Sequence, residues 1–154
     1  LGLHLGTYLD EDHYQWGTKD TGRIGRLTAG VTYRLGEWVK SMDLNFRADV
    51  NTYQFKEGRA VKLSLLPMIT FPDVNSGFPL YFGGGAGVGV FFKQIPKESS
   101  LSFDYQLVAG IRFLNLWNDS MGITLESGIK NHVGLLDDGQ YNGVFLALGL
   151  AFTF

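Results

Sequence analysis

Nine consecutive residues, Met42 to Val50, alternate without a break between apolar and polar side chains. Every second residue is apolar, and each residue between them is charged or an amide. Successive side chains of a β-strand point to opposite faces, so this pattern gives one apolar and one polar face. Wound as an α-helix, the same residues would spread Asp43, Arg47 and Asp49 around the cylinder. The segment therefore predicts a β-strand.

The same alternation recurs along the whole chain and predicts eight strands. They cover residues 1–9, 27–35, 42–55, 61–71, 80–93, 101–113, 121–130 and 144–154. Turn residues separate them, as in Asn75-Ser76-Gly77 and Asp137-Asp138-Gly139. No helical segment is left over. An even number of antiparallel strands can close into a barrel and leave no unpaired edge.

Composition excludes several other classes of protein. Of the 154 residues, 45% are hydrophobic, yet apolar and polar residues are interleaved. No stretch approaches the roughly 18 apolar residues of a membrane-spanning helix. The net charge of −2 offers no electrostatic basis for binding nucleic acid. Cysteine is absent, which excludes thiol catalysis, disulfides and cysteine-ligated metals.

Alternation alone does not say which face points outward. A soluble barrel, with its apolar face inside, is the alternative. The polar face is rich in glycine and carries charges of both signs that could form ion pairs in a narrow lumen. These charges are Asp43, Arg47, Asp49, Lys62, Lys93, Asp104, Arg112, Glu126 and Lys130. The predicted polarity therefore places the apolar face outside, towards lipid.

Aromatic residues and the end of the chain favour the same polarity. Aromatics gather near one set of predicted strand ends, as in the girdle at a membrane interface. They are Tyr33, Trp38, Phe71, Phe78, Phe82, Phe113, Trp117 and Phe152. The ending Gly149 to Phe154 resembles the C-terminal signal of outer-membrane barrels, with spaced apolar residues and a terminal aromatic. The expected fold is therefore an all-β, eight-stranded, antiparallel up-and-down transmembrane β-barrel, a single outer-membrane domain over residues 1–154.

Few motifs point to chemistry. The run Gly83 to Gly89 lacks the spacing of a phosphate-binding loop, and we expect its small residues to fill a tight interior. Asp10, Asp12 and His13 are weak candidates for a metal site, with a solvated acidic loop as the preferred interpretation. Glu126, Lys130 and His132 share one face and could form a polar cluster near the outer rim. A structural ion-pair cluster is favoured there over catalysis.

Four segments of the second half of the chain carry a family resemblance: Leu63 to Pro67, Gly85 to Phe91, Ser99 to Phe103 and Ser120 to Ile123. In their order and spacing, over roughly residues 61–139, they resemble the PagL family of outer-membrane lipid A deacylases. The resemblance implies a His and a Ser two residues apart on the lipid-facing side of the seventh strand, with a nearby Glu.

A gapless match puts Ser127 at the His position and Ile129 at the Ser position. The Glu position falls near Gln140 to Asn142, where no acid stands. The resemblance therefore supports the fold and argues against the hydrolase activity.

Three functions remain as hypotheses. The first is a non-enzymatic outer-membrane barrel with a structural or interaction role, alone or as a subunit of a larger complex, with recognition by loops such as 10–23. The second is a lipid A-modifying hydrolase using Ser127, Glu126 and His132. The third is a small pore or transporter for apolar compounds. Expected partners are outer-membrane lipid, lipopolysaccharide and other outer-membrane proteins, with no nucleic acid and no cofactor. An exported chain of this kind would have lost a signal peptide before Leu1.

Overall fold

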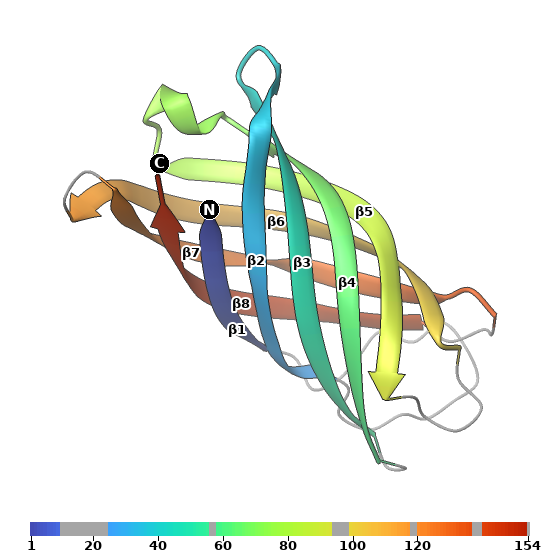
Figure 1. The fold of residues 1–154 in the computed structure, drawn as a ribbon. Coiled ribbons are helices and arrows are strands. Elements are labelled where there is room, and N and C mark those ends of the chain that lie inside the picture. Colours follow the sequence, from blue (N-terminus) through green and yellow to red (C-terminus); the bar gives the residue numbers. More distant parts are fainter. Residues whose placement is uncertain (10–24, 56–57, 94–98, 118–119, 137–139, 154) are drawn as a thin grey trace.

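The computed structural model describes residues 1–9, 25–55, 58–93, 99–117, 120–136 and 140–153. Eight antiparallel strands form one closed barrel in sequence order, and β1 pairs with β8 to complete it. The strands are β1 (Gly2–Tyr8), β2 (Gly25–Val39), β3 (Met42–Phe55), β4 (Gly58–Phe71), β5 (Leu80–Lys93), β6 (Leu101–Trp117), β7 (Met121–Gly134) and β8 (Gln140–Phe152). The eight-stranded up-and-down fold predicted from the sequence is confirmed. Both termini lie at the same end of the barrel (Figure 1).

Several strands are longer than the sequence pattern predicted. β2 reaches Val39, although its pairing register with β3 shifts between Arg34 and Gly36 and again between Glu37 and Val39. A similar shift between Phe113 and Trp117 accompanies the extension of β6. Such irregularities interrupt the two-residue period, so the strand continues after the alternation has stopped.

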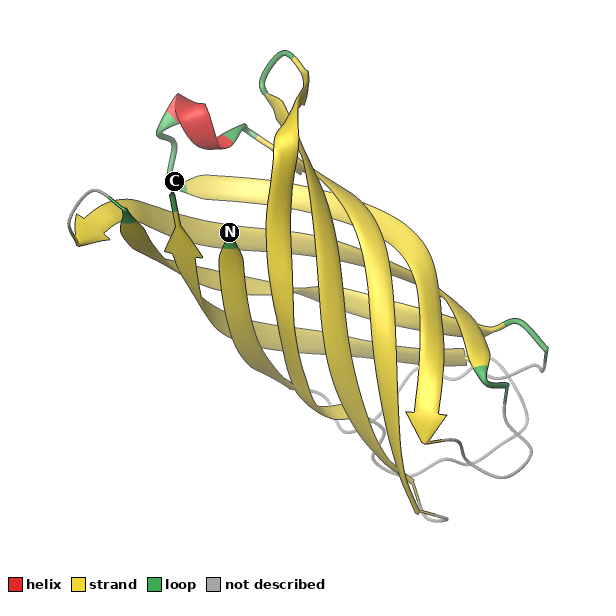
Figure 2. Cartoon of the chain, in the orientation of Figure 1, coloured by secondary structure: helices red, strands yellow, loops and turns green. Residues whose placement is uncertain are grey.

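The expectation that no helix would form is wrong at one place. A single 3₁₀ turn, η1 (Val74–Ser76), lies between β4 and β5 at the end that holds the termini (Figure 2). The Asp73 side chain accepts a hydrogen bond from the backbone N–H of Ser76 and caps this turn. Gly77 ends it with a positive φ of 67°, which a residue without a side chain adopts at no steric cost. Among the described residues, no helix is long and apolar enough to cross a membrane.

The barrel has an inverted polarity. Large apolar side chains on its outer face are exposed, with Leu107 at 56% and Leu148 at 61%. Charged side chains on the inner face are buried, with Asp49 at 1% and Lys62 at 0%. The glycines and the mixed charges of the polar face predicted this polarity, and the arrangement of a soluble barrel, with an apolar interior and a polar exterior, is not the one observed.

Glycines on the inner face allow the lumen side chains to fit. A Cβ atom on Gly87 would collide with the carbonyl oxygen of Leu65. One on Gly89 would collide with the side chains of Ser102 and Asp104. The predicted role of the glycine run on β5, to leave space inside a tight barrel, is confirmed.

Aromatic side chains surround the barrel at the end that holds the termini. Trp38, Phe82 and Phe113 are each more than half exposed on the outer face. Tyr33, Phe71 and Phe78 are exposed at the same end, and Phe152 is half-buried there. The side chain of Trp117 and the terminal Phe154 lie outside the described residues.

Candidate functional site

Among the described residues, three groups of buried ion pairs are stacked along the lumen, in addition to the Arg34–Asp43 pair nearer the termini. In the first, Arg47 on β3 faces Glu126 on β7 and makes two hydrogen bonds, Nη1 to Oε1 at 2.6 Å and Nη2 to Oε2 at 2.8 Å. Tyr81 on β5 donates its hydroxyl to the same carboxylate at 2.8 Å. The Nε of Arg47 also donates to Thr32 at 2.9 Å. Four strands are therefore joined through one buried pair.

The second group centres on Asp49, two residues further along β3. Lys130 on β7 donates to Asp49 Oδ2 at 2.5 Å and to the Thr28 hydroxyl at 2.8 Å. His4 Nε2 lies 2.8 Å from the other oxygen of Asp49. The ring of Phe145 lies 4.7 Å from the Lys130 ammonium, a cation–π distance.

The third group lies nearest the end opposite the termini. Lys62 on β4 donates to both oxygens of Asp104 on β6, at 2.7 and 2.8 Å. Ser102 donates to Asp104 at 2.6 Å, and His132 Nδ1 lies 3.0 Å from Asp104 Oδ1 and also contacts Lys62. The side chains of Lys62, Asp104 and His132 are all at most 4% exposed.

The predicted cluster of Glu126, Lys130 and His132 near the outer rim is wrong. The three residues share the inner face of β7, but each belongs to a different group of partners. A strand rises about 3.3 Å per residue, so Lys130 and His132 lie roughly 13 and 20 Å along the strand from Glu126. Residues on the same face of one strand follow one another along the length of the barrel, so they can lie too far apart to be in contact.

Ser127 lies on the outer face of β7, between the inward-facing Glu126 and Gly128. Its hydroxyl donates to the carbonyl oxygen of Phe145 on β8 at 2.9 Å. Glu126 and His132 face the lumen and are buried there. The candidate hydrolase residues Ser127, Glu126 and His132 are therefore not brought together. Ile129, the next outward residue, is 44% exposed and offers no nucleophile.

The remaining predicted residues are Lys93 and the metal-site candidates. Lys93 was expected in the lumen but is exposed at the end of β5, beyond the region in which the barrel encloses its side chains. Asp10, Asp12 and His13 lie outside the described residues. Within the described part of the chain, no group of three or more His, Cys, Asp or Glu side chains could hold a metal ion.

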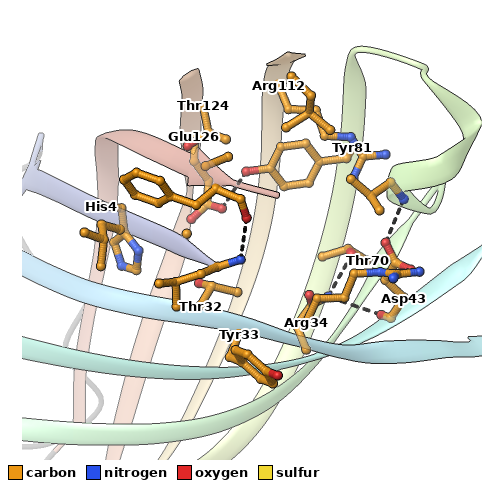
Figure 3. Close-up of a pocket in the computed structure, with 18 of the residues that line it drawn as sticks. His4, Thr32, Tyr33, Arg34, Asp43, Thr70, Tyr81, Arg112, Thr124 and Glu126 are labelled. Atoms are coloured by element: carbon orange, nitrogen blue, oxygen red, sulfur yellow. Dashed lines mark hydrogen bonds and ion pairs between the residues drawn. The ribbon is translucent and has the colours of Figure 1, made fainter. Parts of the chain in front are cut away.

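A cavity of about 440 Å³ opens at the end of the barrel that holds the termini. We call it the vestibule; Figure 3 shows its lining side chains. Its lining includes the charged or titratable residues His4, Arg34, Asp43, Arg47, Arg112 and Glu126 and the inward-facing Tyr81, while Tyr33 and Phe152 border it from outward positions of their strands. Beyond Arg47 and Glu126, the fully buried Leu66, Met68 and Phe145 fill the lumen.

Two ionic contacts shape the outer part of the vestibule. Arg34 Nη2 lies 2.7 Å from Asp43 Oδ1, and Asp43 Oδ2 accepts a hydrogen bond from the Val74 N–H at 2.7 Å. On another side, Arg112 Nη2 donates to the carbonyl oxygens of Pro72 at 2.7 Å and Asp73 at 2.5 Å. These contacts attach the β4–β5 connection to the barrel wall.

The vestibule was not predicted from the sequence. Asp43 and Arg112 were predicted on the inner face, but Arg34 and His4 were not among the predicted lumen charges. Both residues stand at inward positions of the alternation, so that pattern could have found them. Nothing in the pattern indicates that inward residues at this end leave a cavity while those in the middle pack closely.

Comparison of the sequence with protein-family models and with curated proteins gives no match. Among solved structures, the barrel is similar to the outer membrane enzyme PagL, with a TM-score of 0.55 and 16% sequence identity. The similarity covers 96% of this chain and 96% of the PagL chain. The two proteins share the eight-stranded barrel fold. At this identity, the similarity carries no residue-level information about activity.

Proposed function

We propose that this chain is a non-enzymatic, integral β-barrel of the bacterial outer membrane with a structural or interaction role, formed by one domain over residues 1–154. The observation that carries this proposal is the inverted polarity. An outer face with Leu107 and Leu148 more than half exposed is costly in water and favourable in hydrocarbon. Closure by pairing of β1 with β8 leaves no unpaired strand edge, as a bilayer requires.

The lengths of the connections support an orientation for the barrel. The termini and the short connections 40–41 and 118–120 lie at one end, together with 72–79. The opposite end carries the longest connection, 9–24. Barrels of this class have short periplasmic turns and longer extracellular loops, so the termini end would face the periplasm. The opposite end would meet lipopolysaccharide or another outer-membrane protein, and its loops would carry recognition.

The absence of a role in hydrolysis is supported by the surroundings of Ser127. Acyl transfer by a serine requires a base within hydrogen-bonding reach of its hydroxyl. The Ser127 hydroxyl donates instead to the carbonyl of Phe145. An active lipid A hydrolase would change the acyl pattern of lipid A in cells that produce the protein, and mass spectrometry of lipid A tests this. The proposal expects an unchanged pattern, and loss of an acyl chain would overturn it.

A closed lumen gives a second expected result. In the middle of the lumen, Leu66 and Phe145 and the charged residues Asp49, Lys62, Asp104 and Lys130 are each at most 2% exposed, so no continuous water path is expected past them. We expect the protein, inserted into planar lipid bilayers, to give no stepwise current above that of protein-free bilayers. A known porin, measured in the same bilayers, is the positive control that shows that an inserted channel can be detected. Reproducible current steps from this chain would contradict the closed lumen.

A further inference from the structure

The vestibule has the size and lining of a small-molecule site. Its volume of about 440 Å³ lies within the range of roughly 300–1,000 Å³ that is usual for ligand pockets. Inward-facing apolar residues such as Leu114 and Ala151 line it together with hydroxyl and charged groups. It is walled by residues from several strands of the barrel, so its shape depends on a rigid scaffold.

One arginine in the lining of the vestibule has no carboxylate in direct contact. Arg34 is paired with Asp43, and Arg47 is paired with Glu126. Arg112 is the third arginine in the lining, and no carboxylate of the described residues lies within ion-pair distance of it. The lining therefore holds three guanidinium groups and two carboxylates, and the Asp43 and Asp73 carboxylates act on Arg112 through space without contacting it.

The Arg112 guanidinium is held in a fixed position. Its Nη2 donates to Pro72 and Asp73, and its plane lies over the ring of Tyr81, with 5.3 Å between Cζ and the ring centroid. Figure 3 shows Arg112 and Tyr81 next to each other at the cavity. No described residue accepts a hydrogen bond from Nη1. A guanidinium that is already oriented loses little further entropy when it binds an oxyanion.

We propose that the vestibule binds a small molecule with one oxyanion group, a carboxylate or a phosphate, and an apolar body. Arg112 holds the oxyanion through Nη1, because a guanidinium matches the geometry of both groups. Leu114 and Ala151 contact the apolar body. This inference goes beyond the proposed function and does not depend on it, because the cavity exists whichever membrane or surface the barrel occupies.

A purely structural role of Arg112 is the competing explanation. Its hydrogen bonds to Pro72 and Asp73 secure the β4–β5 connection, and they would do so without any ligand. The two explanations predict different binding of small anions in solution. A structural arginine has no preference between an anion and its neutral analogue, whereas a binding arginine does.

The test is an NMR titration of the full chain, refolded in an uncharged detergent, with benzoate, phenyl phosphate and the neutral benzamide. The signal followed is the side-chain Nε–Hε of Arg112, assigned by its loss in Arg112→Met and in Arg112→Lys. We expect a saturable shift with at least one anion and none with benzamide. A response to benzoate alone indicates a carboxylate ligand, and a response to phenyl phosphate alone indicates a phosphate.

The variants separate binding from folding. The Arg112 signal is absent from its own variants, so their affinity is read from the backbone amide signal of Leu114, which also lines the vestibule. Arg112→Met should weaken anion binding by roughly tenfold or more, the loss expected for a charge-assisted contact. Arg59→Met removes an exposed arginine at the opposite end of the barrel and should leave the affinity unchanged. If Arg112→Met does not fold, the test uses Arg112→Lys in its place, together with the comparison of benzoate and benzamide on the wild-type protein. No saturable shift with either anion, an equal shift with benzamide, or undiminished binding by a folded Arg112 variant would overturn the proposal.

Discussion

Replacing Arg47 with Met is expected to lower the free energy of unfolding by about 3–5 kcal/mol, because it leaves Glu126 in the interior without its cation. Glu126 is 5% exposed, and the lost contact is a two-bonded one with distances of 2.6 and 2.8 Å. Tyr81 would still donate one hydrogen bond to the carboxylate, which does not replace a charge. Urea-dependent folding into lipid vesicles measures the change.

The control for this prediction is the double variant Arg47→Met with Glu126→Gln. Removal of both charges from a buried pair is often close to neutral, so the double variant should recover most of the loss. A loss below about 1 kcal/mol for Arg47→Met alone, the range of exposed pairs, would contradict the burial of this pair. A double variant as unstable as the single one would show that lost packing, and not the unpaired charge, causes the effect.

Leu107→Arg is expected to destabilise the barrel in a bilayer by about 2–4 kcal/mol, the cost of a basic side chain on the lipid face near the midplane. Leu107 lies near the middle of the paired part of β6, opposite Ile129 on β7 and Gly84 on β5. It is 56% exposed, so its substitution disturbs little packing within the protein. Folding equilibria in vesicles measure the change.

Phe92→Arg is the matched control, since Phe92 is also exposed on the outer face but stands next to the end of β5. A basic side chain near the interface should cost only about 0–1 kcal/mol. On a surface in contact with water, both substitutions would change stability by no more than about 0.5 kcal/mol. Equal and small effects at the two positions would therefore contradict a lipid-facing surface.

The strands could be predicted from the sequence because side-chain alternation is a local property with a fixed period. Residues 42–50 display it without interruption, and β3 was placed correctly at both ends. Glycines and charges on one face also indicated which side would be buried. Where a register shift occurs, as at Gly36 on β2, the period fails and the predicted end comes too early.

The pairing of the lumen charges could not be predicted in the same way. Arg47 and Glu126 are 79 residues apart, and their contact depends on how far each strand is staggered around the closed barrel. That stagger is set by all eight registers together. Sequence spacing therefore grouped Glu126, Lys130 and His132 on one strand, whereas the partners of each come from other strands. The vestibule could not be predicted for a related reason. A cavity remains only where the side chains of all the surrounding strands together leave space unfilled, and the pattern of one strand does not show this.

The most direct test of the lipid-facing barrel is the environment of position 107 in a bilayer. The chain has no cysteine, so a single Leu107→Cys substitution allows one nitroxide spin label to be attached without further changes. In lipid vesicles, we expect electron paramagnetic resonance to show strong relaxation of this label by oxygen, which concentrates in hydrocarbon, and weak relaxation by a water-soluble nickel complex. Relaxation dominated by the nickel complex would place this face in water and contradict the account.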